Sequence, residues 1–353
     1  MQRNSCLRTP ARRRLRLRTI LCLALLAWIP GALAQSALRY AGVNLAGAEF
    51  NSAKKPGVVF KDYTYPAESA YAYVAAQGMN IVRLPFLWER LQPVAHGELD
   101  AAQLGYLRTA VERARLHGLR VILDVHNYAK YDGVRIGGDA VPASALADLW
   151  RRLGIAFGND EAVVFGLMNE PNGMPADDWA ATAQLAIDAI RGAGAYNLIL
   201  VPGTAFTGAH SWSSTWYGVP NAQALLAISD PAENMAFEVH QYLDATSSGT
   251  SPACVSTTVG SEKLRGFTQW LRDHGQRGFL GEFGASSDAT CMAALDDMLG
   301  YVHDNADVWV GWTAWAAGAW WKTDYAFSLQ PDNQGTDKPQ VQVLSARARQ
   351  VVQ

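Results

Sequence analysis

The sequence lacks an excess of charge of either sign. Its 353 residues include 30 lysines and arginines against 32 aspartates and glutamates, which gives a formal net charge of −2. A protein that coats nucleic acid needs a cationic face for the phosphates, so this balance argues against a nucleic-acid partner. With 49% hydrophobic and 18% charged residues, the chain is also too apolar for a disordered protein, and a large buried core is expected.

Cysteine is scarce, and two of the four cysteines, Cys6 and Cys22, lie in a segment that the working protein is expected to lose. Seven arginines precede residue 19, an apolar stretch covers residues 19–29, and the small residues Ala32 and Ala34 follow. This pattern is typical of a secretory signal peptide, residues 1–34, cleaved before residues 35–353. The apolar stretch is too short for a transmembrane helix, although an uncleaved anchor is the alternative.

The other two cysteines, Cys254 and Cys291, form an even pair in a chain expected to reach an oxidising compartment. We therefore predict a disulfide between them; two separate buried thiols are the alternative. A zinc site is not indicated, because two cysteines without a nearby histidine pattern do not supply a zinc ligand set.

Eight short apolar runs, each bounded by glycine, proline or asparagine, predict eight strands buried on both faces. They cover residues 40–46, 80–85, 120–126, 163–170, 198–203, 235–242, 278–283 and 309–315. Helical spacing is found between them, at residues 66–77, 101–117, 142–157, 176–191, 262–274 and 289–303. Since strands alternate with helices and no linker interrupts them, the sequence predicts an α/β fold, a single (β/α)8 TIM barrel.

An open, doubly wound sheet is the structural alternative. Such a sheet usually carries a glycine-rich phosphate loop after an early strand, and the glycines at residues 42–47 have the wrong spacing. The chain also has no Gly-x-Ser-x-Gly elbow and no His-Glu-x-x-His motif. The nucleophile of an acyl hydrolase and the ligands of a zinc protease are therefore missing.

Polar residues stand at the carboxyl ends of the predicted strands, where a TIM barrel builds its active site. They are Arg83, His126, Asn169, Glu170, His240, Tyr242, Glu282 and Trp315. A buried glutamate without a partner is costly, so two glutamates at matching strand ends suggest a working pair. Two carboxyl groups suffice to cleave a glycosidic bond, one as proton donor and one as nucleophile.

In this order and at these strands, the residues resemble glycoside hydrolase family 5. The strings LMNEP at residues 167–171 and GFLGEFG at residues 278–284 are similar to the acid/base and nucleophile strands of that family. The runs at residues 42–50 and 124–128 are similar to its secreted endo-β-1,4-glucanase (cellulase) branch. The resemblance covers nearly all of residues 40–322.

The resemblance implies a role for each catalytic residue. Glu170 would be the acid/base, which protonates the leaving oxygen and later activates water. Glu282 would be the nucleophile that forms a covalent glycosyl-enzyme. Asn169 would bind the 2-hydroxyl of the sugar at the cleavage point. An ion pair without catalytic function is the alternative for the two glutamates.

The remaining site residues would support these three. Arg83 and Tyr242 would orient the nucleophile, although Arg83 could also close the barrel as a salt bridge. His126 and His240 would contact sugar hydroxyls or steer the acid/base, unless both are structural histidines. Trp315 would form the floor beneath the cleaved sugar, unless it is ordinary core.

The resemblance implies a β-glucan polysaccharide as substrate. The signal peptide predicts a secreted protein, and because two carboxyl groups and water complete the reaction, we expect no metal or cofactor. We also expect a monomer. Mannan, xylan and mixed-linkage or β-1,3-glucan remain alternative substrates, because specificity depends on loops. A glycan-binding barrel without activity and a metal-dependent hydrolase built on the two histidines are the alternatives from other classes. Loop tryptophans are candidate sugar platforms, namely Trp88, Trp212, Trp216, Trp320 and Trp321. Three further acids near strand ends are interpreted as supporting or solvated, namely Glu89, Glu238 and Asp244.

Overall fold

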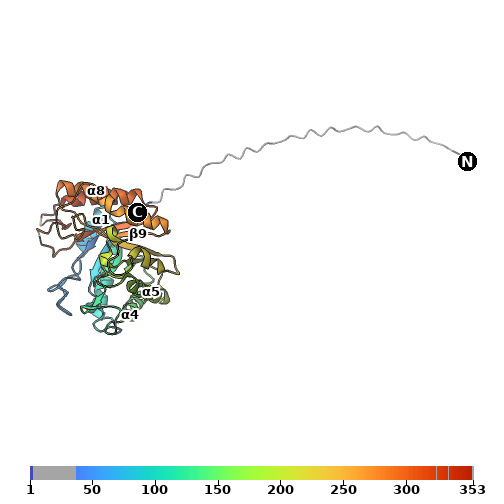
Figure 1. Ribbon diagram of the computed structural model, residues 1–353, viewed down its shortest axis with the longest axis horizontal. Helices are drawn as coiled ribbons and strands as arrows, with labels where there is room; N and C mark the ends of the chain where they lie inside the picture. The colour runs from blue at the N-terminus through green and yellow to red at the C-terminus, as the bar shows by residue number, and fades with distance from the viewer. Residues whose placement is uncertain (3–36, 323, 333, 352–353) are drawn as a thin grey trace. The chain divides into compact units, whose positions relative to one another are not determined.

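The computed structural model describes residues 1–2, 37–322, 324–332 and 334–351 (Figure 1). Apart from its first two residues, the predicted signal peptide lies outside this range. Within the described part of the chain, no helix is both long enough and apolar enough to cross a membrane.

Eight parallel strands close into a barrel, which confirms the predicted TIM barrel. The order around the barrel is β1-β10-β9-β8-β7-β6-β3-β2, so the first and last strands of the chain pair with each other. The strands are β1 (Tyr40–Leu45), β2 (Ile81–Phe86), β3 (Arg120–Val125), β6 (Val163–Gly166), β7 (Ile199–Pro202), β8 (Met235–His240), β9 (Gly278–Glu282) and β10 (Trp309–Ala317). A small hairpin, β4 (Lys130–Tyr131) and β5 (Val134–Arg135), lies after β3.

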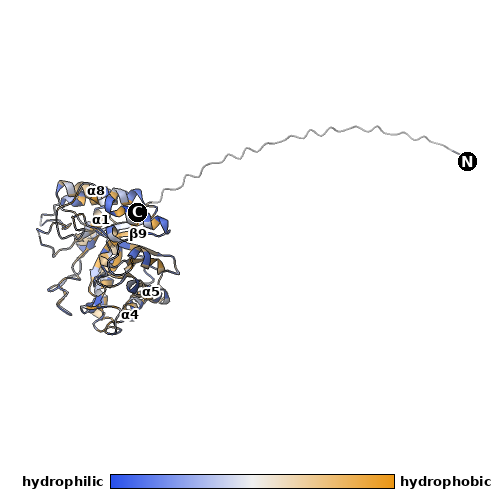
Figure 2. Ribbon diagram, in the orientation of Figure 1, coloured by the Kyte–Doolittle hydropathy of each residue, from blue (hydrophilic) through white to orange (hydrophobic). Residues whose placement is uncertain are grey.

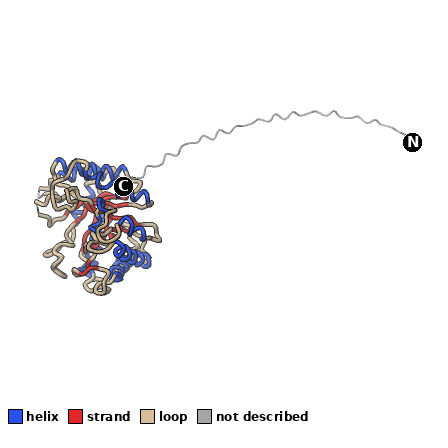
Figure 3. Tube along the Cα trace, viewed as in Figure 1, coloured by secondary structure: helices blue, strands red, loops and turns tan. Residues whose placement is uncertain are grey.

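Helices surround the strands (Figure 3), and all six predicted helices are present. They are α1 (Glu68–Ala76), α3 (Ala101–Leu116), α4 (Ala143–Phe157), α5 (Ala176–Gly192), α7 (Val259–Asp273) and α8 (Ala289–Asp304). Hydrophilic and hydrophobic residues share the ribbons of α4, α5 and α8 in Figure 2. This distribution is expected for helices that cover a barrel with one face and meet water with the other.

Three helices were not predicted from the sequence. Two are single turns, α2 (Trp88–Leu91) and α6 (Asn221–Ala224). The third, α9 (Pro339–Ala348), follows the last strand and packs on α8 and β1. Between β7 and β8 the chain forms α6 and short 3-10 turns in place of a long helix. The strand β7 is therefore not followed by a regular helix like those after most other strands.

The tryptophans divide between the core and the surface. Trp88 and Trp212 are fully buried, so the hypothesis that they are sugar platforms is wrong. The Nε1 of Trp88 donates to Gln92, and the ring of Trp212 packs among Phe237, Phe267 and Trp270. Both side chains therefore point inward and pack as large apolar groups in the core.

The predicted disulfide between Cys254 and Cys291 is present, with a Cα–Cα distance of 5.2 Å. It joins the long loop after β8 to the first turn of α8. The side chain of Asp288 caps that turn by accepting from the backbone N–H groups of Thr290 and Cys291. The disulfide therefore anchors a loop that rises from the carboxyl end of β8.

Candidate active site

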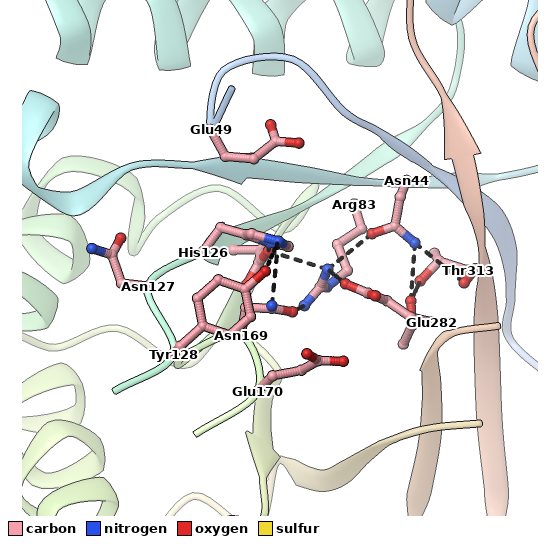
Figure 4. Close-up of polar contacts among 12 residues, drawn as sticks. Asn44, Glu49, Arg83, His126, Asn127, Tyr128, Asn169, Glu170, Glu282 and Thr313 are labelled. Atoms are coloured by element: carbon pink, nitrogen blue, oxygen red, sulfur yellow. Dashed lines mark hydrogen bonds and ion pairs between the residues drawn. The ribbon is translucent and has the colours of Figure 1, made fainter. Parts of the chain in front are cut away.

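The two ends of the barrel interior differ in chemistry. Apolar side chains fill the lower layer, among them Ile81, Ile122, Val164 and Phe279. Polar side chains occupy the carboxyl ends of the strands, and the structure brings together all eight predicted site residues there. Figure 4 shows five of them, Arg83, His126, Asn169, Glu170 and Glu282. This is the end at which a TIM barrel carries its active site.

Arg83, in β2, is the centre of the site and is completely buried. Its Nη1 donates to Oε1 of Glu282 at 2.8 Å, and its Nη2 donates to Oδ1 of Asn169 at 2.9 Å. Asp124 and Glu238 form ion pairs with the same guanidinium, each at 3.1 Å. Burial alone would lower the pKa of Arg83, but these three carboxylates raise it. Arg83 therefore closes the barrel with salt bridges and also contacts Glu282 and Asn169.

Glu282, at the end of β9, is held on both of its oxygens. Oε1 accepts from Arg83, and Oε2 accepts from the hydroxyl of Tyr242 at 3.0 Å. Burial, with a contribution from Glu170, raises the pKa of Glu282 above its usual value, and His240 and Arg83 counteract this rise. Donors on both oxygens and two adjacent cations favour the ionised carboxylate in spite of the burial.

Glu170 lies opposite Glu282 and is more accessible, since 17% of its side chain is exposed against 5% for Glu282. Its backbone has φ 44°, a left-handed conformation that is uncommon outside glycine and often occurs at functional sites. One oxygen of Glu170, one oxygen of Glu282 and a ring nitrogen of His240 all lie within 4.8 Å of one another. The two carboxylates thus face a common space.

His240 bridges the acidic residues around it. Its Nδ1 lies 2.8 Å from Oε1 of Glu170, and its Nε2 lies 3.2 Å from Oε1 of Glu238. Burial alone would lower the pKa of His240, but Glu282, Glu170 and Glu238 raise it to about 10. At neutral pH both ring nitrogens therefore carry a proton and donate.

Among the described residues, Glu170, His240 and Glu282 are the one group of three side chains close enough to hold a metal ion. A metal-bound histidine must be neutral and offer a lone pair. Both ring nitrogens of His240 lie within hydrogen-bond distance of carboxylates, Nδ1 of Glu170 and Nε2 of Glu238, and these neighbours raise its pKa and favour the protonated ring. This donor set fits an ion-pair network better than a metal site.

His126, just after β3, forms the opposite wall. Its Nδ1 lies 2.7 Å from Oδ2 of Asp124, and the side-chain amide of Asn169 lies 3.3 Å from its Nε2. Burial alone would lower the pKa of His126, but Asp124 raises it. The ring of Trp315, at 5.7 Å and 17°, stacks on His126. Trp315 is half-buried, and its Nε1 donates to the hydroxyl of Tyr325.

Aromatic side chains continue the floor beyond Trp315. Trp321 packs edge-on against Trp315, and Tyr325 stacks on Trp321. Trp321 and Tyr325 line a pocket of about 540 Å³ together with Phe50 and Trp320. Trp216, on the loop after β7, is 59% exposed. The exposed members of the predicted tryptophan set are therefore Trp216 and Trp320, with Trp321 half-buried.

Two functional residues were missed in the sequence, and one was interpreted too loosely. Asn44, in β1, accepts from Arg83 at 2.9 Å and donates to the carbonyl of Gly281, the residue before Glu282. Asp124 bonds both Arg83 and His126. Glu238 is buried between Arg83 and His240. In the sequence, each of these three residues is a polar residue inside an otherwise apolar predicted strand, and this feature could have identified them.

The barrel and its carboxylate pair define a glycoside hydrolase. The sequence pattern of the cellulase family, glycosyl hydrolase family 5, matches residues 42–318. The chain belongs to this family.

Known members are similar over most of the chain. Endo-beta-1,4-glucanase B of Emericella nidulans is 37% identical over 291 residues, 82% of this chain and 85% of that protein. The structure of the endo-beta-1,4-glucanase Xac0029 from Xanthomonas axonopodis pv. citri is 59% identical, with a TM-score of 0.89, and covers 90% of this chain and 100% of that one. XacCel5A, solved in complex with cellopentaose, is 61% identical, with a TM-score of 0.87 over 88% of this chain and 99% of that one.

Proposed function

We propose that the protein is a secreted, retaining endo-β-1,4-glucanase in which Glu170 is the acid/base and Glu282 the nucleophile. One observation carries the mechanism: oxygens of the two carboxylates lie within 4.8 Å of each other. Retaining glycosidases hold their carboxyl groups about 5–5.5 Å apart, whereas inverting enzymes need about 6.5–9.5 Å to admit a water molecule. The short separation supports direct attack by one glutamate.

In the first step, an oxygen of Glu282 attacks the anomeric carbon, and the bond from that carbon to the leaving oxygen breaks. Glu170 gives its proton to the leaving oxygen, so the shortened chain departs as a neutral alcohol. Arg83 and Tyr242 hold Glu282 in place for the attack. The hydrogen bond from His240 occupies Oε1 of Glu170, which leaves Oε2 for the proton in transfer.

In the second step, Glu170, now a carboxylate, takes a proton from water, and the oxygen of that water attacks the anomeric carbon. The bond to Glu282 breaks, and both glutamates return to their initial protonation states. Two displacements at the same carbon leave its configuration unchanged. Asn169, with its amide held between Arg83 and His126, is the proposed contact for the 2-hydroxyl.

The substrate assignment is supported by the relatives. The similar proteins from Emericella nidulans and Xanthomonas axonopodis pv. citri bear the name endo-beta-1,4-glucanase, and XacCel5A binds cellopentaose. Flat aromatic rings such as Trp315 and Trp320 suit the apolar faces of glucose units. Internal cleavage of a β-1,4-glucan chain is therefore the reaction that we propose, by a monomer without metal or cofactor.

Secretion is proposed from two independent features. Residues 1–34 have the pattern of a cleavable signal peptide, which would leave residues 35–353 as the catalytic domain. The disulfide between Cys254 and Cys291 is a bond that persists in oxidising compartments and is rare in the cytosol.

Release of reducing ends from a panel of soluble polysaccharides tests the proposed substrate. We expect carboxymethyl cellulose and mixed-linkage β-glucan to be cleaved, and mannan and xylan to be cleaved much more slowly. Activity should persist in EDTA. A preference for mannan or xylan would overturn the substrate assignment, and loss of activity in EDTA with rescue by added metal would overturn the metal-free mechanism.

A further inference from the structure

The loop after β8 folds back against the ring of Tyr242, the residue that donates to Glu282. The contact is made by Gly249, at which a Cβ would lie 2.7 Å from Cδ1 of Tyr242. The φ angle of Gly249 is +69°. Glycine alone combines this close approach with a left-handed backbone at no steric cost, so the main chain itself forms one wall against the ring.

Phe327 provides a second contact for the ring of Tyr242. Its ring stacks on Tyr242 with centroids 5.9 Å apart and an interplanar angle of 29°. The hydroxyl of Tyr242 then reaches Oε2 of Glu282 at 3.0 Å. The position of this hydroxyl depends on how firmly Gly249 and Phe327 hold the ring.

Asp244 fixes the position of Gly249. Its Oδ1 accepts from the backbone N–H of Gly249 at 3.0 Å, and its Oδ2 accepts from the hydroxyls of Thr246 and Ser248 at 2.8 and 3.3 Å. Asp244 is only 3% exposed, so it is not a solvated acid. Hydrogen bonds to a buried carboxylate are stronger than those between neutral groups, and they close the segment from Asp244 to Gly249 into a tight turn.

The far end of the loop is anchored separately. The backbone N–H of Val255 donates to the carbonyl of Leu243 at 3.1 Å, and the neighbouring Cys254 forms the disulfide with Cys291. The loop from Leu243 to Val255 is thus closed at its base, and within it the turn from Asp244 to Gly249 packs on Tyr242.

We infer that Asp244 is a positioning residue for the reaction, which acts on the nucleophile through Gly249 and the hydroxyl of Tyr242. The inference rests on the proposed function, in which Glu282 must be ionised to attack. Loss of Asp244 frees Gly249, loosens the ring of Tyr242 and weakens one of the hydrogen bonds that stabilise the Glu282 carboxylate.

The inference predicts a change in the pH dependence of activity. Removing a donor from an ionised carboxylate raises its pKa, so the acidic limb of kcat/KM moves to higher pH. The other ionisable groups near Glu282 are the charged or titrating side chains Arg83, His240, Glu170 and His126 and the phenols Tyr128 and Tyr325. None of them touches the turn from Asp244 to Gly249 through a hydrogen bond in the described part of the chain, so their contributions stay constant.

The test is a double-mutant cycle of Asp244→Ala and Tyr242→Phe, with kcat/KM measured across pH on a soluble cello-oligosaccharide. We expect Asp244→Ala to lower kcat/KM about ten-fold and to move the acidic limb upward by about one pH unit. In the Tyr242→Phe background it should have little further effect, because the hydroxyl through which it acts is gone. Asp244→Asn, which keeps an oxygen for Gly249, should restore most of the activity.

Asp230 offers a matched control at the opposite end of β8. Its buried carboxylate also closes a turn, through the N–H groups of Ala232 and Asn234. Asp230→Ala should lower stability without moving the acidic limb. If Asp244→Ala does not fold, Gly249→Ala, which pushes the ring directly, must produce the same shift.

Two results would overturn the inference. In the first, the double variant loses kcat/KM by the product of the two single-variant factors, so that the two residues act independently. In the second, Asp244→Ala leaves the acidic limb of kcat/KM at the wild-type pH. A failure of the proposed function looks different. In that case Tyr242→Phe alone would keep the wild-type pH profile, and the inference would fall together with the assigned site.

Discussion

At the scale of single residues, the site depends on charge compensation inside the barrel. Arg83 and the protonated His240 lie among Asp124, Glu238 and Glu282. A buried charge without a partner is strongly destabilising, so removing any one of these groups would leave its partners as unpaired buried charges. The carboxylates of this network raise the pKa of His240 to about 10, and the resulting positive charge, with that of Arg83, opposes the rise that burial causes in the pKa of Glu282. The contacts that stabilise the buried charges are therefore the same contacts that hold Glu282, the proposed nucleophile.

Replacement of the acid/base should have an effect that depends on the leaving group. We expect Glu170→Gln to lower kcat on cello-oligosaccharides by about 10²–10⁴-fold, because their leaving oxygen needs the proton. The glycosylation rate on an activated aryl cellobioside should change far less. Pre-steady-state kinetics on both substrates provides the measurement.

The nucleophile variant and a surface variant serve as comparisons for that result. Glu282→Gln should abolish the first step on both substrates, since no other group forms the covalent bond. Glu262→Gln, at an exposed position of α7, should leave both rates unchanged. Equal losses on the two substrates in Glu170→Gln would show that Glu170 is not the acid.

Glu49 makes stability depend on pH. Burial raises the pKa of Glu49 from 4.5 to about 7, since only Oε2 is bonded, to the N–H of Gly47, and Oε1 lacks a partner among the described residues. Because the folded state holds the proton more tightly, stability falls as pH rises from about 4.5 to about 7. Over this pH range the raised pKa of Glu49 lowers the free energy of unfolding by a total on the order of 3 kcal/mol.

Glu49→Gln removes this titration and gives a second prediction at the residue scale. We expect the variant to gain in Tm relative to the wild type as pH rises from 4.5 to 7.5. Thermal unfolding at several pH values measures the difference. A difference in Tm that stays constant across this range would show that Glu49 does not titrate there.

At the scale of elements, the strands could be predicted because a parallel barrel buries both strand faces and therefore produces continuous apolar runs. The same burial explains why Asn44 and Asp124 were missed. An apolar run that is buried on both faces does not reveal which residues point into the barrel. The residues at strand ends, such as Glu170 and Glu282, could be identified because the apolar run stops there.

Loops were predicted less well than strands. Trp88 follows β2 almost directly and Trp212 lies ten residues after β7, but both rings point inward and are buried. The direction of a loop depends on contacts made far along the chain, such as those of Trp212 with Phe267 and Trp270. No local pattern carries that information.

The disulfide stabilises the loop after β8 and the helix α8 as a unit. Its two cysteines are 37 residues apart, and closing a loop of this length contributes about 4 kcal/mol in the chain-entropy model. We expect the variant with both Cys254→Ser and Cys291→Ser to lose about that free energy of unfolding in urea. Reductant should destabilise the wild type but not the variant, and equal stability of the two proteins would contradict the predicted contribution.

At the scale of the whole molecule, the proposed endo-action requires that a polymer lie across the barrel end and be cut internally. Exposed aromatic side chains after β7 and β10, Trp216 and Trp320, are suited to hold the chain beyond the cleavage point. The viscosity of carboxymethyl cellulose should then fall much faster than reducing ends appear. Early release of glucose or cellobiose with little change in viscosity would contradict internal cleavage.

The central claim is that Glu282 attacks carbon directly while Glu170 transfers the proton, and the configuration of the first-formed product tests it most directly. Proton NMR of a cello-oligosaccharide digest, recorded before mutarotation, distinguishes the two anomers. The carboxylate separation within 4.8 Å predicts that the β-anomer forms first, because it leaves no room for a water molecule between glutamate and sugar. Initial formation of the α-anomer would contradict the account.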